Sequence, residues 1–292
     1  MTAFLASIPS PGSGVLELGP LRIHAYGITL LVAIAACVWL TGTRWVRRGG
    51  DWDLIFRVAV WGVAAGIVGA RAYHVLTSWD QVPDEWWGPL AIWEGGLSVW
   101  GGIGLGVIVG AIVVRRSGES VRALMDVVAP GLLLAQAIGR IGNWWNQELY
   151  GKPTDLPWAL EIDPEHRQLG YQNEPTFHPT FLYELLYNLV GVALLLLLDR
   201  RFRFRPPALF ALYVSFYTFG RFFIEMLRID PSHEWGPLRL NSWVSLVLFV
   251  LSTAFFVWWQ FLRRGPDARE RAAARPKGPA MAVPRGRVRP SR

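Results

Sequence analysis

The chain has 292 residues, of which 52% are hydrophobic and 17% are charged, and its mean hydropathy is +0.28. An ordinary soluble domain has roughly 25% charged residues, and a soluble chain could not hide so much apolar surface from water. The composition therefore excludes a disordered chain, a collagen-like fibre and most soluble enzymes. It indicates a protein of the lipid bilayer.

The net charge of +7 is concentrated in one segment. Residues 263–292 contain ten Lys/Arg and two Asp/Glu, a net charge of +8 that leaves −1 for the remainder. The basic balance therefore gives no reason to expect nucleic-acid binding, and this Pro-, Ala- and Arg-rich tail is expected to be disordered. The first basic residue is Arg22, so no cleavable signal peptide is expected. Cys37 is the single cysteine, which excludes an internal disulfide and a CxxC metal site.

Seven apolar stretches are long enough to cross a hydrocarbon core of roughly 30 Å as helices. Helices are required because lipid offers the backbone no hydrogen-bond partners. The predicted spans are 24–43, 55–77, 97–114, 122–142, 180–198, 208–227 and 241–262. The predicted fold class is therefore all-α, a polytopic membrane protein with seven transmembrane helices.

Lys and Arg are unevenly distributed between the loops. The loops at 44–54, 115–121 and 199–207 hold nine basic residues, whereas the alternate loops hold four. Because basic loops stay in the cytoplasm, the N-terminus is predicted outside and the tail inside. We expect an external arm (1–23), a transmembrane domain (24–262) with a small external head (143–179), and a cytoplasmic tail (263–292).

Ionisable side chains within spans are costly and are therefore candidates for function. This set comprises Arg71, Asp126, Arg140, Glu184, Arg221 and Glu225. Tyr26 starts the first span, where it is either functional or part of an interfacial aromatic belt. A glycine-rich run at 95–102 opens the third span and would permit close approach of a backbone or a lipid. It is not the GxSxG turn of a serine hydrolase, because Trp100 occupies the fifth position.

The first polar cluster, GRIGNWWNQELYG at 139–151, closes the fourth span. In a continuous helix Arg140 and Asn143 share one face at i, i+3. The guanidinium fork of Arg140 suits phosphate or carboxylate, and the alternative is a structural Arg–Glu pair at a helix end. The nearby Asn146 and Glu148 favour a binding site.

The second cluster, GRFFIEMLR at 220–228, places Arg221, Glu225 and Arg228 on one helical face. An internal Arg221–Glu225 salt bridge is the alternative, but one Glu cannot neutralise two Arg. The surplus cation requires an anion, and phospholipid phosphate is the one at hand. The third cluster is HPTFLYE at 178–184. For His178, a helix cap with internal hydrogen bonds is as good an explanation as a catalytic role.

Together these segments resemble the bacterial phosphatidylglycerol–prolipoprotein diacylglyceryl transferase family, over roughly residues 20–262. The matching segments are 139–151, 178–184, 220–225, Tyr26-Gly27 and Gly69-Ala70-Arg71, and the pattern at 71–74 looks actinobacterial. The resemblance implies a multi-pass enzyme of the bacterial cell membrane. It would transfer the diacylglyceryl group of phosphatidylglycerol to the lipobox cysteine of a prolipoprotein signal peptide, forming a thioether and releasing glycerol 1-phosphate. Phosphatidylglycerol, the prolipoprotein and membrane lipid are the implied partners, and no cofactor or metal is expected.

The resemblance also assigns residues by motif position. We expect Arg140, Arg221, Glu148 and Glu225 to be catalytic, with the two arginines holding the phosphate as it leaves. We expect substrate binding by Arg140, Asn143, Asn146, Gly151, Tyr26, Arg71, His178 and Tyr183. Where the family often has a His, sometimes proposed as a base, this chain has Trp100, whose indole has no basic nitrogen. Glu148, His24, the substrate itself or water are the alternatives for the base.

Two other functions fit the intramembrane charges. A transporter or flippase for an anionic lipid or solute would use the same Arg and Glu residues, and its substrate would emerge chemically unchanged. A receptor-like binding module explains the clustered Arg, Asn and Glu poorly. The specificity of the 139–151 segment favours the transferase.

Overall fold

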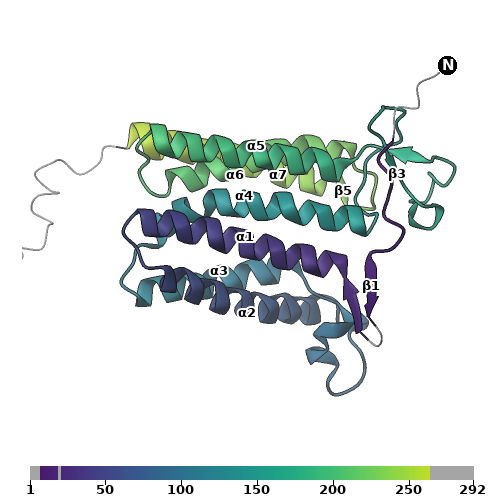
Figure 1. Cartoon of the computed structure of the whole chain (residues 1–292), viewed down its shortest axis with the longest axis horizontal. Helices are drawn as coiled ribbons and strands as arrows, with labels where there is room; N and C mark the ends of the chain where they lie inside the picture. The colour runs from purple at the N-terminus through teal and green to yellow at the C-terminus, as the bar shows by residue number, and fades with distance from the viewer. Residues whose placement is uncertain (1–6, 19–20, 264–292) are drawn as a thin grey trace, which may run out of the picture.

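The computed structural model describes residues 7–18 and 21–263. Its long helices form one elongated bundle (Figure 1). They are α1 (Ala25–Arg47), α2 (Trp52–Thr77), α3 (Val99–Arg116), α4 (Val121–Trp145), α5 (Thr180–Arg201), α6 (Ala208–Leu227) and α7 (Leu240–Val257), and a π-helical turn, η5 (Trp258–Leu262), continues α7.

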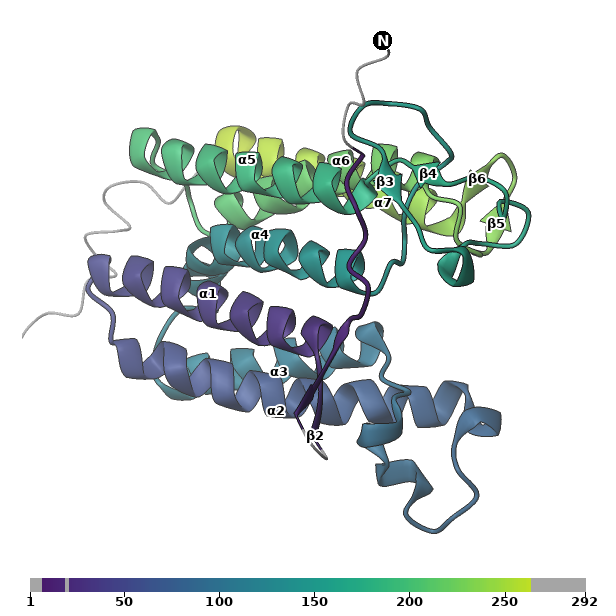
Figure 2. The ribbon, with the colours of Figure 1, turned by 45° about the vertical axis from the view of Figure 1, so that its right-hand side comes forward.

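In the described part of the chain, three short antiparallel hairpins lie at the same end of the bundle (Figures 1 and 2). They pair β1 (Val15–Leu18) with β2 (Leu21–His24), β3 (Leu160–Glu161) with β4 (Thr176–Phe177), and β5 (Glu234–Trp235) with β6 (Leu238–Arg239). Four 3₁₀ turns complete the connections: η1 (Trp79–Gln81), η2 (Gly88–Leu90), η3 (Ile92–Glu94) and η4 (Pro164–His166).

Among the residues that the structure describes, six helices are long and apolar enough to cross a membrane, namely α1 to α5 and α7 with η5. The prediction of a mostly helical, polytopic membrane protein is therefore confirmed. The predicted seventh span corresponds to α6, which has 20 residues but is not among these six. Arg221 and Glu225 lie within α6 and lower its hydropathy.

Helix α4 occupies the centre of the bundle, where it contacts α1, α5 and α6. Its buried face includes Leu133 and Ala137, and Leu133 packs with Leu195 of α5 and Leu209 of α6 in one apolar cluster. A central helix of this kind can present side chains to several neighbours at once. Residues near its C-terminal end are therefore well placed to meet residues of α5 and α6.

The glycine-rich run brings α3 against α2. A Cβ added at Gly69 would lie 2.4 Å from the carbonyl oxygen of Gly101, and one added at Gly101 would lie 2.2 Å from the carbonyl oxygen of Gly69. Any side chain at either position would force the helices apart. The close approach expected of this run is thus made to a backbone, that of α2.

A buried network of hydrogen bonds and an ion pair connects four helices at the end opposite the hairpins. Pro130 lacks an N–H, so the carbonyl of Asp126, four residues earlier in α4, has no helical donor. Arg44 of α1 donates to this carbonyl at 3.1 Å and pairs with Asp199 of α5 at 2.9 Å. The Asp126 carboxylate accepts the backbone N–H of Phe210 at 2.9 Å, in the first turn of α6. Asp126 therefore serves helix packing.

Described residues of the arm contact the head. Ile8 donates its N–H to the carbonyl of Ala159 at 2.8 Å, and its own carbonyl accepts from the N–H of Glu161 at 2.9 Å. After the last turn of α4, the regular elements of the head are β3, β4 and η4. The boundaries of arm, head and tail stay predictions, and residues 1–6, 19–20 and 264–292 lie outside the described part of the chain.

Candidate functional site

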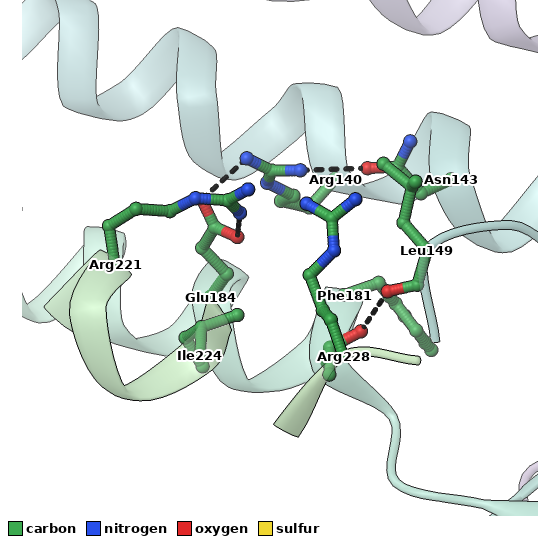
Figure 3. Close-up of a pocket in the computed structure, with 9 residues that line it drawn as sticks. Arg140, Asn143, Leu149, Phe181, Glu184, Arg221, Ile224 and Arg228 are labelled. Carbon is green, nitrogen blue, oxygen red and sulfur yellow. Dashed lines mark hydrogen bonds and ion pairs between the residues drawn. The ribbon is translucent and has the colours of Figure 1, made fainter. Parts of the chain in front are cut away.

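A narrow pocket opens at the hairpin end of the bundle, where α4 ends and α5 begins (Figure 3). It contains about 190 Å³ of empty space, including solvent at its mouth. Its lining comes from α4, the segment after α4, α5 and the end of α6: Arg140, Asn143, Leu149, Thr180, Phe181, Glu184, Arg221, Ile224 and Arg228. Three arginines thus share this pocket with one carboxylate.

Glu184 connects the two clusters that the sequence singled out. Its Oε1 accepts from Nη2 of Arg140 at 2.5 Å, and its Oε2 accepts from Nη1 of Arg221 at 3.1 Å. The Glu184 side chain is 4% exposed. A buried charge without a partner is costly, so the two arginines and Glu184 stay paired. This carboxylate therefore fixes the positions of both guanidinium groups.

Glu225 does not line the pocket, but it pairs with a second group of arginines. It is fully buried and accepts from Nη2 of Arg221 at 2.6 Å. Arg239 of β6 lies 3.3 Å away and Arg228 lies 3.6 Å away. Asn241 adds a hydrogen bond at 3.2 Å. The Arg221–Glu225 pair considered from the sequence therefore forms, as part of a larger network.

Asp230 completes this network outside the helices. It accepts two hydrogen bonds from Arg228, at 2.7 and 2.8 Å, and one from Arg239 at 3.0 Å. Burial acts to raise the pKa of Asp230, but Arg228 and then Arg239 outweigh it and lower that pKa below its usual value. Asp230 is therefore an anion that holds Arg228 at the pocket.

Positive charge exceeds negative charge among the residues that are joined by ion pairs. Four guanidinium groups (Arg140, Arg221, Arg228 and Arg239) face three carboxylates (Glu184, Glu225 and Asp230). Figure 3 shows the guanidinium groups of Arg140, Arg221 and Arg228 directed toward one region. A surplus cation in a confined site favours binding of an anion, and guanidinium forks match phosphate oxygens.

The predicted i, i+3 contact on α4 extends into a short hydrogen-bond chain. Nη1 of Arg140 donates to Oδ1 of Asn143 at 3.1 Å, and Nδ2 of Asn143 donates to Oε1 of Glu148 at 2.8 Å. Asn143 is 6% exposed, whereas Glu148 is half-buried. The chain joins Glu148 to the arginine network without a direct ion pair.

The segment after α4 has an unusual backbone. Gln147 and Leu149 have φ angles of +51° and +58°, in the left-handed region that side chains other than glycine rarely adopt. The buried Gln147 amide donates to Asp163 at 2.5 Å and to the carbonyl of Pro11 at 3.2 Å, and it accepts from the N–H of Asp163 at 2.8 Å. The carbonyl of Leu149 accepts from Thr180 at 2.6 Å. Arm and head together hold this segment at the pocket edge.

Gly151, His178 and Tyr183 lie next to the pocket. A Cβ at Gly151 would lie 2.8 Å from Cβ of His178, so the position requires glycine. Nδ1 of His178 lies 3.1 Å from the Tyr183 hydroxyl, which also accepts from Trp158 at 3.0 Å. Burial, and then the charge of Lys152, lower the pKa of His178 below its usual value. Burial and the charge of Lys152 therefore both favour the neutral imidazole.

The remaining predicted residues have different surroundings. Tyr26 packs on Gly142 of α4, where a Cβ would lie 2.6 Å from the tyrosine ring. Asn146 is exposed at the C-cap of α4. Arg71 is buried outside the pocket lining and donates to the carbonyls of Pro89, Gly95, Gly96 and Gly88 at 3.0, 2.8, 3.2 and 2.6 Å. Substrate binding by these residues stays a prediction.

Trp100 lies in the first turn of α3, is 65% exposed and does not line the pocket. Within residues 7–18 and 21–263, no group of three His, Cys, Asp or Glu side chains is placed to hold a metal ion.

Several pocket residues were not in the predicted set: Arg228, Glu184, Thr180, Leu149, Phe181 and Ile224. The spacing of 220–228 already placed Arg228 on the face of Arg221, and that signal was sufficient to include it. Glu184 was recognised as an intramembrane charge, but its two partners lie 44 and 37 residues away. No local spacing could pair them.

Fold and site together define a multi-pass membrane protein with an arginine-rich pocket at one end of its helices. A family model described as prolipoprotein diacylglyceryl transferase matches residues 13–258. This chain belongs to the prolipoprotein diacylglyceryl transferase family, as the sequence predicted.

Similar proteins bear the same name. The chain is 50% identical over 256 residues to phosphatidylglycerol–prolipoprotein diacylglyceryl transferase 2 of Streptomyces coelicolor, covering 87% of this chain and 81% of that protein. It is 47% identical over 268 residues to the Streptomyces griseus enzyme (90% and 81% covered). It is 48% identical over 246 residues to that of Cutibacterium acnes (83% and 83% covered).

Proposed function

We propose that this protein transfers the diacylglyceryl group of phosphatidylglycerol to the lipobox cysteine thiol of a prolipoprotein. The observation that carries the proposal is the convergence of Arg140, Arg221 and Arg228 on a pocket with one carboxylate. A phosphodiester headgroup supplies the anion that this surplus charge favours. Family membership supplies the identity of both substrates.

The reaction is a displacement at carbon. The cysteine thiolate attacks the diacylglycerol carbon that bears the phosphate, and a carbon–sulfur bond forms as the carbon–oxygen bond breaks. The electron pair of the broken bond leaves with glycerol 1-phosphate, on which negative charge increases. Arg140 and Arg221 bind this phosphate, and preorganised guanidinium groups stabilise such charge most effectively where water is scarce.

Other residues position these two cations. Glu184 sets the separation of Arg140 and Arg221, and Glu225 orients Arg221 from behind. Arg228, held by Asp230, adds a third cation for the phosphate. Asn143 orients Arg140 and is positioned to contact the glycerol headgroup.

The thiol proton requires an acceptor. Glu148 is half-buried and connected through Asn143 to Arg140, so it lies beside the phosphate site. His24 is exposed at the end of β2. We therefore assign proton acceptance to Glu148 and not to His24. The cationic surroundings also favour the thiolate.

The proposed function also includes a membrane topology, in which the pocket opens on the outer side. Helix α6 is the seventh span, and its charged residues face the pocket and its supporting network and not lipid. The N-terminus, the arm (1–23) and the head (143–179) lie outside, and the basic tail (263–292) is cytoplasmic. The pocket then faces the side on which secreted precursors emerge.

The test uses purified protein in micelles containing phosphatidylglycerol and a peptide with a lipobox cysteine. We expect mass spectrometry to detect the peptide with a diacylglyceryl thioether, and no product from a peptide with serine in place of that cysteine. Folded protein that moves the lipid between leaflets of vesicles and leaves the peptide unmodified would contradict the proposal and support the flippase.

A further inference from the structure

A second cationic site lies at the end of the bundle opposite the pocket. Three segments meet there: the start of α4, the α5–α6 connection and the η5 turn after α7. The arginines on these segments are Arg122, Arg203, Arg205 and Arg263. In the described part of the chain, none of the four forms a salt bridge with a carboxylate.

Trp259 organises this site. The Arg263 guanidinium lies 4.1 Å from the centroid of its ring, and that of Arg122 lies 5.5 Å from it. Both distances are within the range of cation–π attraction. Two arginines that are 141 residues apart in the sequence thus contact one indole.

The α5–α6 connection is fixed against the same turn. The indole N–H of Trp259 donates to the carbonyl of Arg205 at 3.1 Å, and Gln260 donates to the carbonyl of Arg203 at 3.2 Å. Gln260 also accepts from the N–H of Arg205 at 3.0 Å, while the Arg205 side chain donates to the carbonyl of Arg263 at 2.6 Å. Specific contacts therefore hold the backbone of Arg203 and the guanidinium of Arg205 at this turn.

An apolar surface adjoins the cations. Phe255 stacks on Trp259 at 5.5 Å, and Trp258, Phe261 and Leu262 are 48%, 70% and 69% exposed. A cationic rim beside exposed aromatic side chains matches an amphipathic anion, with phosphate at the rim and acyl chains along the aromatic surface.

We propose that this second site, Arg122, Arg203, Arg205, Trp259 and Arg263, binds the headgroup of an anionic phospholipid. The ligand is a bilayer lipid that remains chemically unchanged. The site is separate from the pocket, since the Arg122 position near the start of α4 lies 18 residues before Arg140, about 27 Å along a helix.

The test is lipid-dependent thermal unfolding in detergent, where both ends of the protein are accessible. Phosphatidylserine is the probe, and phosphatidylcholine is the neutral control. The site variant carries Arg122→Gln and Arg263→Gln. The matched control carries Arg115→Gln and Arg116→Gln, two exposed arginines in the last turn of α3 at the same end of the bundle.

We expect phosphatidylserine to raise the Tm of the wild type and of the control at similar lipid concentrations. Each charge near an anionic lipid changes binding about fivefold, so the site variant should need about 30-fold more lipid. Arg122→Gln alone, which removes only the stacking contact with Trp259 among the contacts described above, should need about fivefold more. Transferase activity of these variants is measured separately and reports only on the pocket.

Equal weakening in the site variant and the matched control would overturn the proposal, because the arginines would then act as general charge. Equal stabilisation by phosphatidylcholine would overturn it as well. Neither result depends on the orientation of the protein or on the transferase reaction.

Discussion

Replacing Arg140 with Lys keeps the positive charge and removes the fork. Arg140 uses two different nitrogens, donating to Glu184 at 2.5 Å and to Asn143 at 3.1 Å. It still has N–H groups for the phosphate. A single, compact ammonium cannot satisfy Glu184, Asn143 and a phosphate at the same positions.

The expected loss can be estimated from these contacts. Removing one preorganised donor to a developing anion costs about 2.7–4 kcal/mol, which corresponds to a 10²–10³-fold fall in kcat. We therefore expect the kcat/KM of Arg140→Lys to fall at least 10²-fold. The Tm should change little, since one charged hydrogen-bonding contact to Glu184 is retained.

The assay measures the initial rate of thioether formation over a range of phosphatidylglycerol concentrations. Arg48→Lys is the matched control, because Arg48 pairs with Asp199 at the far end of the bundle. The control should keep near-normal turnover. A kcat/KM for Arg140→Lys within threefold of the wild type would refute the phosphate role of Arg140.

Three further changes test the supporting structure. Gly151→Ala places a Cβ 2.8 Å from that of His178, so we expect destabilisation of about 1–3 kcal/mol, measured by thermal unfolding; an unchanged Tm would show that the segment can shift. Gln147→Ala leaves a non-glycine residue in the left-handed backbone and removes three hydrogen bonds, so kcat should fall. Gln147→Gly should recover part of the lost kcat, because glycine adopts this backbone readily. Full activity of the Ala variant would contradict a positioning role of Gln147. Because the pKa of Asp230 is lowered in the folded protein, its stabilising contribution is present above the unfolded pKa of about 3.9 and is lost as pH falls through the folded value. Asp230→Asn should therefore reduce the fall of the Tm at low pH. The same fall of the Tm in Asp230→Asn and in the wild type would argue against the pairing of Asp230 with Arg228.

Local periodicity was sufficient to predict the contacts within one helix. The i, i+3 relation of Arg140 and Asn143 and the i, i+4 relation of Arg221 and Glu225 both appear as hydrogen bonds. The boundaries of the apolar stretches likewise predicted the long helices to within a few residues. These features depend only on helical geometry and on the apolar length that a bilayer requires.

Contacts between helices could not be predicted in this way. The position of Glu184 between Arg140 and Arg221 depends on the packing of α4, α5 and α6. The left-handed backbone of Gln147 depends on hydrogen bonds to the arm and the head. Arg71 had the same intramembrane signature as Arg140, yet it binds backbone carbonyls of the 88–96 segment. Charge at membrane depth therefore identifies costly residues without identifying their partners.

The same polar residues explain why α6 differs from the other helices. Arg221 and Glu225 reduce its hydropathy, while their mutual pairing and their contacts with Glu184 and Arg239 satisfy their charges inside the protein. Helices α4 and α5 also carry pocket residues and remain apolar enough to cross a membrane, so this effect belongs to α6 and its pair of charges.

The most direct measurement follows the oxygen atom that bridges the diacylglycerol carbon and phosphorus. Phosphatidylglycerol labelled with ¹⁸O at this position is incubated with the protein and a lipobox peptide, and the products are weighed by mass spectrometry. Displacement at carbon with an arginine-bound phosphate leaving group predicts all of the label in glycerol 1-phosphate, released in equal amount to the thioether peptide. Label retained on diacylglycerol, or lipid turnover without a modified peptide, would contradict the account.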